Sequence, residues 1–452
     1  MKVVVGIDLG STTTKAVLLD ESGELVGRGI TNSRSNYEVA CAVAREEALT
    51  AVRFSMLGRA LADVRGAEGD VVAALGSRLE EAFRLELYLG ELNSLREEIL
   101  ALLERPAMKM WSDSLTPAAI EVLDGMADEA SDLFLGGAGR RSDFFRDIAG
   151  ASFMTGAERV AKDGAVPFER LVGLFDRAIL DVETKTEPRD FKVMLGRSAA
   201  RIVRDEDAGD AAGTLRRVVE EVGNTRIEEL AFVGTGYGRQ TLPFEKRAVR
   251  SEILCHGRGA HRVFPNTRTV LDIGGQDTKA IQVDDTGVVT SFQMNDRCAA
   301  GCGRYLGYIA DELNLGLHEL GPLALKANKQ VRVNSTCTVF AGAELRERLA
   351  LGERREDILA GLHRAIMLRA MSLLARSGGI ANEFTFTGGV CKNPAATKVL
   401  RELVDENYDA SIVLNAHPDS IYMGALGAAL FARDDLHSGK AGGLPTFAVS
   451  AG

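Results

Sequence analysis

Aromatic residues and excess positive charge, two features of nucleic-acid-binding surfaces, are both lacking in this chain. Phe, Trp and Tyr make up 6% of the 452 residues, and the formal net charge is −10. Duplex binding needs a basic surface that neutralises phosphates, and single-strand binding needs aromatic side chains that stack on bases. The composition therefore gives no support to a nucleic-acid interface, and we expect no nucleic acid among the partners of this protein.

The sequence also lacks segments that would direct it into a membrane. It has no run of about 18 apolar residues, the length that a membrane-spanning helix needs. Its first residues, MKVVVGIDLGS, lead directly into an expected strand and carry no cleavage-site pattern of a signal peptide. We therefore expect a cytoplasmic protein with no membrane partner. The length exceeds what one ordinary core accommodates, which predicts two or more domains.

Cysteine is infrequent, and its positions are uneven. In a large cytoplasmic chain cysteines are seldom paired in disulfides, so they serve as buried apolar residues, metal ligands or reactive thiols. Cys298, Cys302 and Cys337 lie close together in the second half of the chain. Cys298 is followed by small residues and then an expected helix, and a Cys at a helix start is a better thiolate and metal ligand. We expect the remaining three to be structural: Cys41, Cys255 and Cys391.

Two segments repeat the same order of strand, glycine-rich turn and strand. They are residues 3–19 (VVVGIDLGSTTTKAVLL) and 269–294 (TVLDIGGQDTKAIQVDDTGVVTSFQM), which align without a gap at an offset of 264 residues. Common glycine turns could produce two unrelated hairpins. Here Asp, Lys and turn positions match together, which favours a duplicated domain; the identical pairs are Asp8/Asp272, Gly10/Gly274, Thr14/Thr278, Lys15/Lys279, Ala16/Ala280, Asp20/Asp284 and Gly23/Gly287.

The repeated turn has the chemistry of a phosphate-binding loop. Glycines and small hydroxyl residues let backbone N–H groups approach phosphate oxygens closely, and an Asp at the end of the first strand can hold Mg²⁺ through waters. Two such loops facing each other predict a clamp for ATP or ADP, with Asp8 and Asp272 near Mg²⁺. Lys15 and Lys279 are either partners of the phosphates or members of structural ion pairs. The expected cradle consists of Gly10, Ser11, Thr12 and Thr13 in the first loop, and Gly274, Gly275 and Gln276 in the second.

This arrangement resembles the actin-like ATPase superfamily, in which two ribonuclease-H-like domains bind ATP between their hairpins. Residues 384–394 (FTFTGGVCKNP) resemble its adenosine loop, with Gly388 and Gly389 making room for the nucleoside. Residues 417–432 (HPDSIYMGALGAALFA) resemble its closing helix. The resemblance implies an α/β fold of duplicated actin-like domains.

Several further segments resemble one family within that superfamily. They are GTGYGR (234–239), SEILCH (251–256), NDRCAAGCGRYL (295–306) and NSTCTVFAGAE (334–344). Together they are similar to the activator ATPases of 2-hydroxyacyl-CoA dehydratases and to the ATPase subunits of benzoyl-CoA reductase. The resemblance implies that Cys298 and Cys337, with the same two cysteines of a second, related or identical ATPase subunit, bind a shared [4Fe–4S] cluster. Cys302 stands where that family leads us to expect Thr, so it is a bystander or an auxiliary thiol.

A long segment separates the first hairpin from GTGYGR, and it has helical patterning. Residues 78–104, 109–123 and 168–182 carry apolar residues at helical spacing or a helix start. It is either a helical cap on the first domain or a docking surface for a larger partner complex. We expect residues 1–49 and about 226–267 to form the first actin-like domain, 50–225 a mostly helical insertion, 268–440 a second domain with the cluster cysteines, and 441–452 a tail.

The resemblance implies an ATP-hydrolysing electron activator. It would pass low-potential electrons from reduced ferredoxin to catalytic acyl-CoA-reducing subunits, and the insertion favours a benzoyl-CoA-reducing partner. A homodimeric dehydratase activator, a small-molecule kinase and a chaperone-like ATPase module are the alternatives. Phosphoryl transfer depends on positioning and electrostatics, so no covalent residue is required. For the catalytic groups, Asp8 would place the Mg²⁺, and Glu252 or Gln276 would orient the attacking water.

Overall fold

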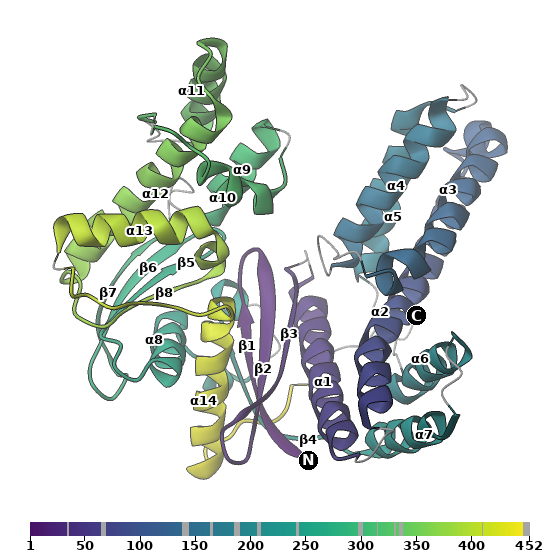
Figure 1. Cartoon of the computed structure of the whole chain (residues 1–452), viewed down its shortest axis with the longest axis horizontal. Coiled ribbons are helices and arrows are strands. Elements are labelled where there is room, and N and C mark those ends of the chain that lie inside the picture. The colour runs from purple at the N-terminus through teal and green to yellow at the C-terminus, as the bar shows by residue number, and fades with distance from the viewer. Residues whose placement is uncertain are drawn as a thin grey trace.

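The protein consists of two β-sheets, each covered by helices, and a separate group of helices (Figure 1). The computed structural model describes residues 1–33, 36–64, 69–137, 144–162, 166–184, 190–205, 209–240, 244–296, 302–313, 315–329, 331–333, 338–408 and 410–445. The predicted mixed α/β architecture with two comparable sheets is confirmed.

The first sheet is built from the N-terminal hairpins and one later strand. Its order is β3-β2-β1-β4, with β1 antiparallel to β2 and parallel to β4. Alternate residues of β1 face opposite sides, as the pleat requires: Val3, Val5 and Ile7 pack toward α1, whereas Val4 packs toward α14. The bounds are β1 Lys2–Leu9, β2 Thr13–Asp20, β3 Leu25–Asn32, β4 Glu228–Thr235, α1 Tyr37–Ala62 and α14 Met423–His437.

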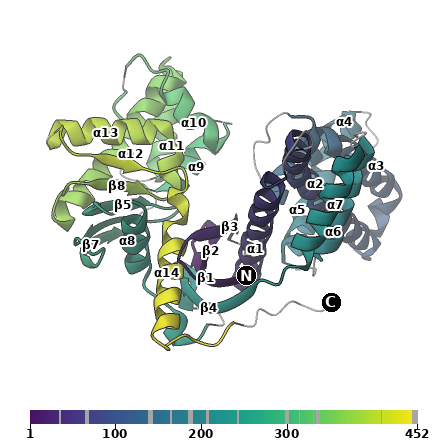
Figure 2. The same cartoon turned by 60° about the horizontal axis from the view of Figure 1, so that its bottom comes forward.

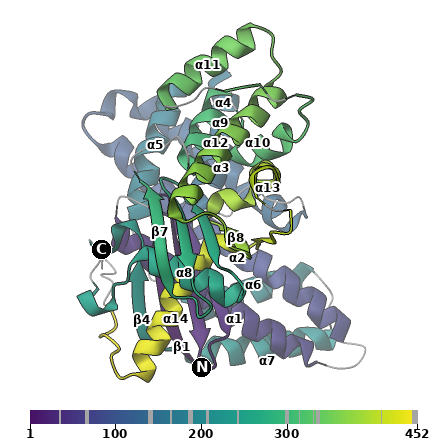
Figure 3. The same ribbon diagram turned by 90° about the vertical axis from the view of Figure 1, so that its left-hand side faces the viewer.

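The second sheet has the order β7-β6-β5-β8-β9. Its outer edge is β7, which faces the viewer in Figure 3. One face of this sheet is buried under its main apolar core, to which α9, α10, α12 and α13 contribute. We call the second sheet with these helices the second lobe, and the first sheet with α1 and α14 the first lobe. The bounds are β5 Thr269–Ile273, β6 Thr278–Val283, β7 Val289–Asn295, β8 Phe384–Thr387, β9 Leu414–Ala416, α9 Gly303–Glu312, α10 Leu317–Ala324, α11 Thr338–Ala350, α12 Arg355–Ser377 and α13 Pro394–Asn407.

The two sheets repeat one register at their glycine-rich turns. Asp8 is opposite Lys15 in the β1–β2 pair, and Asp272 is opposite Lys279 in the β5–β6 pair. The sequence offset therefore corresponds to a repeated structure, and each Asp–Lys couple lies at the turn end of its hairpin.

Helix α8, Glu252–Val263, and helix α14 connect the two lobes. Ile253 and Ala260 of α8 pack on β5 and β6, whereas Cys255 packs toward α14 and the first sheet. In Figure 2, α14 runs beside the first sheet, although its residues follow those of the second. We therefore propose that a division of the chain into domains places α14 with the first lobe, outside the expected 268–440 domain.

The remaining helices form a bundle beyond α1, on the side away from the second lobe (Figures 1 and 2). The 36-residue helix α2 joins two apolar cores, one shared with α3, α4 and α5 and the other with α1, α6 and α7. The boundary expected at residue 50 falls within α1, so we propose that the insertion begins after this helix. The bounds are α2 Gly69–Glu104, α3 Lys109–Leu135, α4 Phe145–Lys162, α5 Phe168–Thr184, α6 Phe191–Asp205 and α7 Gly209–Asn224.

Among the described residues, one helix is long and apolar enough to cross a membrane by length and composition. It is α12, and 67% of its apolar window is buried inside the protein. A core helix satisfies the same criteria, and α12 contributes Ile366, Met367 and Leu374 to the apolar core of the second lobe. The cytoplasmic location stays a prediction.

Candidate nucleotide site between the lobes

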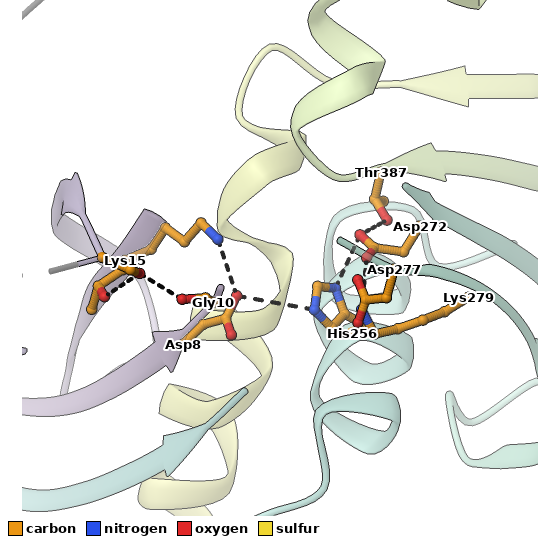
Figure 4. A network of polar contacts seen from close by, with 10 residues as sticks. Asp8, Gly10, Lys15, His256, Asp272, Asp277, Lys279 and Thr387 are labelled. Atoms are coloured by element: carbon orange, nitrogen blue, oxygen red, sulfur yellow. Dashed lines mark hydrogen bonds and ion pairs between the residues drawn. The ribbon is translucent and has the colours of Figure 1, made fainter. Parts of the chain in front are cut away.

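Each lobe places one buried Asp–Lys pair at the cleft (Figure 4). Lys15 Nζ lies 3.6 Å from Asp8 Oδ2, and Lys279 Nζ lies 3.4 Å from Asp272 Oδ2. The pairs come from strand positions directly opposite each other, so the antiparallel register holds them together. Both lysines neutralise carboxylates in this structure, which is one of the two roles expected for them.

The two turns approach each other closely across the cleft. A Cβ atom added to Gly275 would lie 2.0 Å from Thr12 Oγ1, far inside van der Waals contact. At Gly10 an added Cβ would lie 2.7 Å from the Thr13 carbonyl oxygen. Glycine is thus needed at both turns, for the tight loop at Gly10 and for the approach of the opposite loop at Gly275. The repeated turns therefore face each other, as a clamp requires.

His256 links the two aspartates, and the sequence analysis missed it. Its Nε2 lies 4.0 Å from Asp8 Oδ2, and its Nδ1 lies 3.2 Å from Asp272 Oδ1. The contact of this buried Nδ1 atom with Asp272 is an ion pair if the ring is protonated, and no hydrogen bond to Nδ1 is formed among the described residues. Glu252 and His256 are four residues apart on α8. This spacing puts both on one helix face and could have predicted that His256 faces the same site as Glu252.

The second pair lies in a dense network of charge. Thr387 Oγ1 donates a hydrogen bond of 2.8 Å to Asp272 Oδ1, and Asp277 Oδ2 lies 2.8 Å from Lys279 Nζ. Burial alone would raise the pKa of Asp272, but His256 and Lys279 outweigh it and hold that pKa well below its usual range. Burial opposes the charged form of Lys279, but Asp272 and Asp277 raise its pKa. Both groups are therefore charged at neutral pH.

The titration of His256 and Glu252 is also displaced. Burial would lower the pKa of His256, yet the Asp272 carboxylate raises it above the ordinary value. Burial raises the pKa of Glu252, and the neighbouring charges of Lys279 and His256 only partly oppose this shift. A carboxyl group with a raised pKa is a better proton acceptor when ionised, which is the property expected of a base that orients water.

All the residues expected to bind the nucleotide line one cavity of about 1780 Å³. Glu252 and Gln276 line it too, with His256 and Asp277 beside them. Asp8 and Asp272 line this space with carboxylate oxygens, the donors that Mg²⁺ prefers, and the ion itself stays a prediction. The expected residues brought together are Asp8, Gly10, Ser11, Thr12, Thr13, Lys15, Asp272, Gly274, Gly275, Gln276, Lys279, Gly388 and Gly389.

Comparison with known proteins decides the family. A family model described as the BadF/BadG/BcrA/BcrD ATPase family matches residues 5–432. The chain belongs to this ATPase family. It is 41% identical to the (R)-2-hydroxyglutaryl-CoA dehydratase activating ATPase of Acidaminococcus fermentans over 224 residues. This match covers 49% of this chain and 83% of that protein. It is 33% identical over 214 residues to a benzoyl-CoA reductase component of Thauera aromatica, 47% of this chain and 75% of that protein.

A solved structure supports the actin-like fold. The crystal structure of component A of the Acidaminococcus fermentans (R)-2-hydroxyglutaryl-CoA dehydratase matches with a TM-score of 0.53 and 22% sequence identity. The match covers 97% of this chain and all of that one. The predicted family and fold are therefore confirmed, and ATP binding follows from membership of an ATPase family.

The cysteines of this family member divide into two groups. Cys298 and Cys337, the expected cluster ligands, lie outside the described residues, so their role stays a prediction. The other four are buried. Burial raises the pKa of Cys255 to about 12 and raises those of Cys41 and Cys391 as well, so these three are protonated. Among the described residues no group of three or more Cys, His, Asp or Glu side chains could hold a metal ion.

Cys302 is the residue whose role the sequence left open. It is the residue before α9, is 1% exposed, and packs in the apolar core of the second lobe with Tyr305 and Leu306. This environment favours the structural role over an auxiliary thiol. Its chain neighbours are more informative: Gly303 N donates to Gly274 O at 2.8 Å, and Arg304 N donates to Gly275 O at 2.7 Å. The start of α9 is thus bonded directly to the second phosphate loop.

Proposed function

We propose that this protein is an ATP-hydrolysing activator that delivers electrons to an acyl-CoA-processing partner. The observation that carries the proposal is the pair of backbone hydrogen bonds from Gly303 and Arg304 to the second phosphate loop. The segment with Cys298 immediately precedes α9, so a change of loop position at Gly274 and Gly275 moves the backbone next to that cysteine. The family membership supports the ATPase part, and the names of its relatives support the activating part.

In this proposal the nucleotide phosphates occupy the space between the two turns. Mg²⁺, when bound near Asp8 and Asp272, would offset phosphate charge. Backbone N–H groups of the two turns would donate to phosphate oxygens, and Lys15 and Lys279 would add positive charge while remaining close to their carboxylates. Glu252 is the favoured residue to accept the proton of the attacking water, because burial raises its pKa and it faces the same cavity. Gln276 is the alternative group for orienting that water.

The electron-carrying group in this proposal is a [4Fe–4S] cluster held by Cys298 and Cys337 together with the same residues of a second copy or a related chain. Four thiolates are needed, and two of them come from each chain. Such a cluster supplies one-electron transfer at low potential, with reduced ferredoxin as the electron source. The role of this chain is to hold half of the cluster and to move its surroundings with the nucleotide state.

We place a 2-hydroxyacyl-CoA dehydratase first among the candidate partners. Three relatives named as dehydratase activators are 36–41% identical to this chain, whereas the benzoyl-CoA reductase component is 33% identical. The insertion had favoured a benzoyl-CoA-reducing partner in the sequence analysis, and that partner remains the second candidate. Anoxic copurification followed by assay with each class of acyl-CoA distinguishes them.

Iron content tests the proposal directly. A four-iron cluster shared by two chains requires about two iron atoms per chain after anoxic purification. Cys298→Ser and Cys337→Ser should each abolish the iron and leave ATP binding unchanged, whereas Cys302→Ser should retain it. An iron-free, oxygen-indifferent wild-type protein would overturn the electron-activator proposal. Loss of iron in Cys302→Ser alone would overturn the ligand assignment.

A further inference from the structure

The insertion supplies one wall of the cavity that contains the phosphate loops. This wall is made by the end of α3, the start of α4 and the end of α5, from which Leu133, Ile148 and Leu180 line the cavity. In Figure 1, α4 and α5 stand on the opposite side of β1–β3 from α9 and α10. The nucleotide loops are therefore enclosed on three sides: by the first lobe, the second lobe and the insertion.

The cavity that contains the phosphate loops adjoins a second cavity, and insertion residues line both. A second cavity, of about 1600 Å³, extends between α1, β3 and α2. Thr13 and Asn32 of the first lobe, Arg146 and Glu183 of the insertion, and Lys392 of the second lobe each line both cavities. These residues mark a shared boundary, so Arg146 lines the same cavity as Thr13, the last residue of the expected first cradle.

Arg146 carries the positive charge of this wall. Among the described insertion residues that line the cavity, it is the one with a cationic side chain. Lys15 and Lys279, by contrast, are already paired with Asp8 and Asp272. A nucleoside triphosphate carries more negative charge than one Mg²⁺ offsets, and the two Asp–Lys couples are neutral overall, so a further cation facing the cavity can contribute. A guanidinium suits this task, because its fork of donors matches phosphate oxygens.

The present partner of Arg146 leaves it able to move. Its Nη1 lies 3.1 Å from Glu183 Oε2; the Arg146 side chain is 46% exposed and that of Glu183 is 11% exposed. The pair is half-exposed at its Arg146 end, so solvent weakens it there and a phosphate can compete for the guanidinium, while the more buried Glu183 loses one partner. The carboxylate is held in place, while the guanidinium faces the open cavity.

We propose that Arg146 binds the phosphates of the nucleotide in exchange for Glu183, which makes the insertion a third wall of the ATP site. The inference rests on the proposed function only in requiring that the chain bind ATP. It gives the insertion a nucleotide-dependent contact: with ATP bound, α4 is tied to the first phosphate loop, and without it α4 is tied to α5. The bundle thereby responds to the nucleotide state.

Calorimetric titration of the full chain with ATP and with adenosine tests this contact. Arg146→Ala should weaken ATP binding by about tenfold, the range of a charge-assisted hydrogen bond, and leave adenosine binding unchanged. Arg146→Lys should recover part of the loss, because it keeps the charge without the fork. Arg159→Ala is the matched control: Arg159 lies on the same helix, pairs with Glu129 at 3.9 Å, and does not line the cavity.

Three outcomes would overturn the inference. One is an Arg146→Ala protein with the ATP affinity of Arg159→Ala; another is an equal loss for ATP and adenosine, which indicates a general disturbance of the cleft. The third applies if Arg146→Ala does not fold, because Arg146→Lys is then the deciding variant. A ratio of ATP affinity to adenosine affinity equal to that of the wild type in Arg146→Lys would contradict the contact. Failure here leaves iron content and the Cys298→Ser result untouched, so it is distinguishable from failure of the electron-activator proposal.

Discussion

The two phosphate loops share one backbone plan but differ in what surrounds them. In the first, Asp8 has a single lysine at 3.6 Å. In the second, Asp272 contacts Lys279, His256 and Thr387 within 3.4 Å. The first loop faces the insertion, whereas the second is hydrogen-bonded to the start of α9. Duplication thus preserved the clamp, and the surroundings of the second copy tie it to the cysteine-bearing segment.

This asymmetry indicates a division of labour between the copies. A carboxylate held by several partners is fixed in position, and a loop bonded to a helix start moves that helix when it moves. The second loop therefore has the properties of a coupling element. The first loop is bonded instead to Ser33, whose N–H donates to Thr12 O and whose Oγ donates to Gly10 O, and the insertion lines the cavity that it faces.

The largest expected difference between the loops is in stability. Asp272→Asn removes the carboxylate that compensates the buried Lys279 and His256, and breaking a buried ion pair of this kind costs roughly 3–5 kcal/mol. Asp8→Asn removes a carboxylate whose neighbours are farther away, Lys15 at 3.6 Å and His256 at 4.0 Å, and should cost less. Urea unfolding monitored by circular dichroism measures both changes. Equal free-energy losses for the two variants would contradict the asymmetry.

The closeness of the loops predicts a large catalytic effect for a single methyl group. Gly275→Ala places a Cβ 2.0 Å from Thr12 Oγ1 and forces the turns apart. A displacement of about 1 Å at reacting groups can lower the rate about 100-fold, so we expect a loss of that order in steady-state ATP hydrolysis.

Gly173→Ala is the control for this substitution. An added Cβ at Gly173, within α5, meets nothing within 4 Å. It should therefore preserve ATP hydrolysis and slightly stabilise the helix. Unchanged hydrolysis in Gly275→Ala would show that the loops do not approach as closely in the working enzyme.

His256 provides a sharper test of how the two lobes are linked. His256→Gln removes the side chain that contacts both Asp8 and Asp272. If the poorer positioning raises the activation free energy of hydrolysis by about 1.4 kcal/mol, turnover becomes about tenfold slower. His261→Gln is the matched control, because His261 lies on the same helix but contacts the Asp285 carbonyl oxygen. The Mg²⁺ dependence of ATP hydrolysis should change in the first variant only. A parallel change in both would reduce His256 to a structural role.

Acid should weaken the second loop progressively. The pKa of Asp272 is lower in the folded protein than its ordinary value of 3.8, so its stabilising contribution is complete above that value. It is lost as the pH falls through the folded pKa, by at most about 1.4 kcal/mol per pH unit for one proton. The free energy of unfolding of Asp272→Asn should therefore fall less steeply below about pH 4 than that of the wild type. Parallel slopes would contradict the lowered pKa.

The local sequence pattern predicted the hairpins well, because residues close together in the sequence determine their turns and strand register. Asp, Gly and Lys at fixed spacing specify both the turn and the register, and the order of the loops along the chain predicted one shared cleft. The pattern did not predict that α14 packs on the first sheet while Ile253 of α8 packs on the second. Nor did it show that α1 continues past residue 50 to Ala62.

The missed site residues depend on tertiary placement. His256 bridges two aspartates that are far apart in sequence, and its burial arises only when α8 lies between the lobes. Arg146 belongs to an insertion whose helical pattern was evident but whose direction was not. The helix starts after Cys298 and Cys337 were predicted from local signals, whereas the bonds from α9 to Gly274 and Gly275 required the folded chain.

One spectroscopic measurement tests the central claim that the second loop couples nucleotide to the cysteine segment. The electron paramagnetic resonance spectrum of the reduced, anoxically purified protein should change on addition of ATP and Mg²⁺. It should change less in Gly275→Ala at saturating ATP. A wild-type spectrum that is identical with and without bound ATP, or the absence of any iron–sulfur signal, would contradict the account.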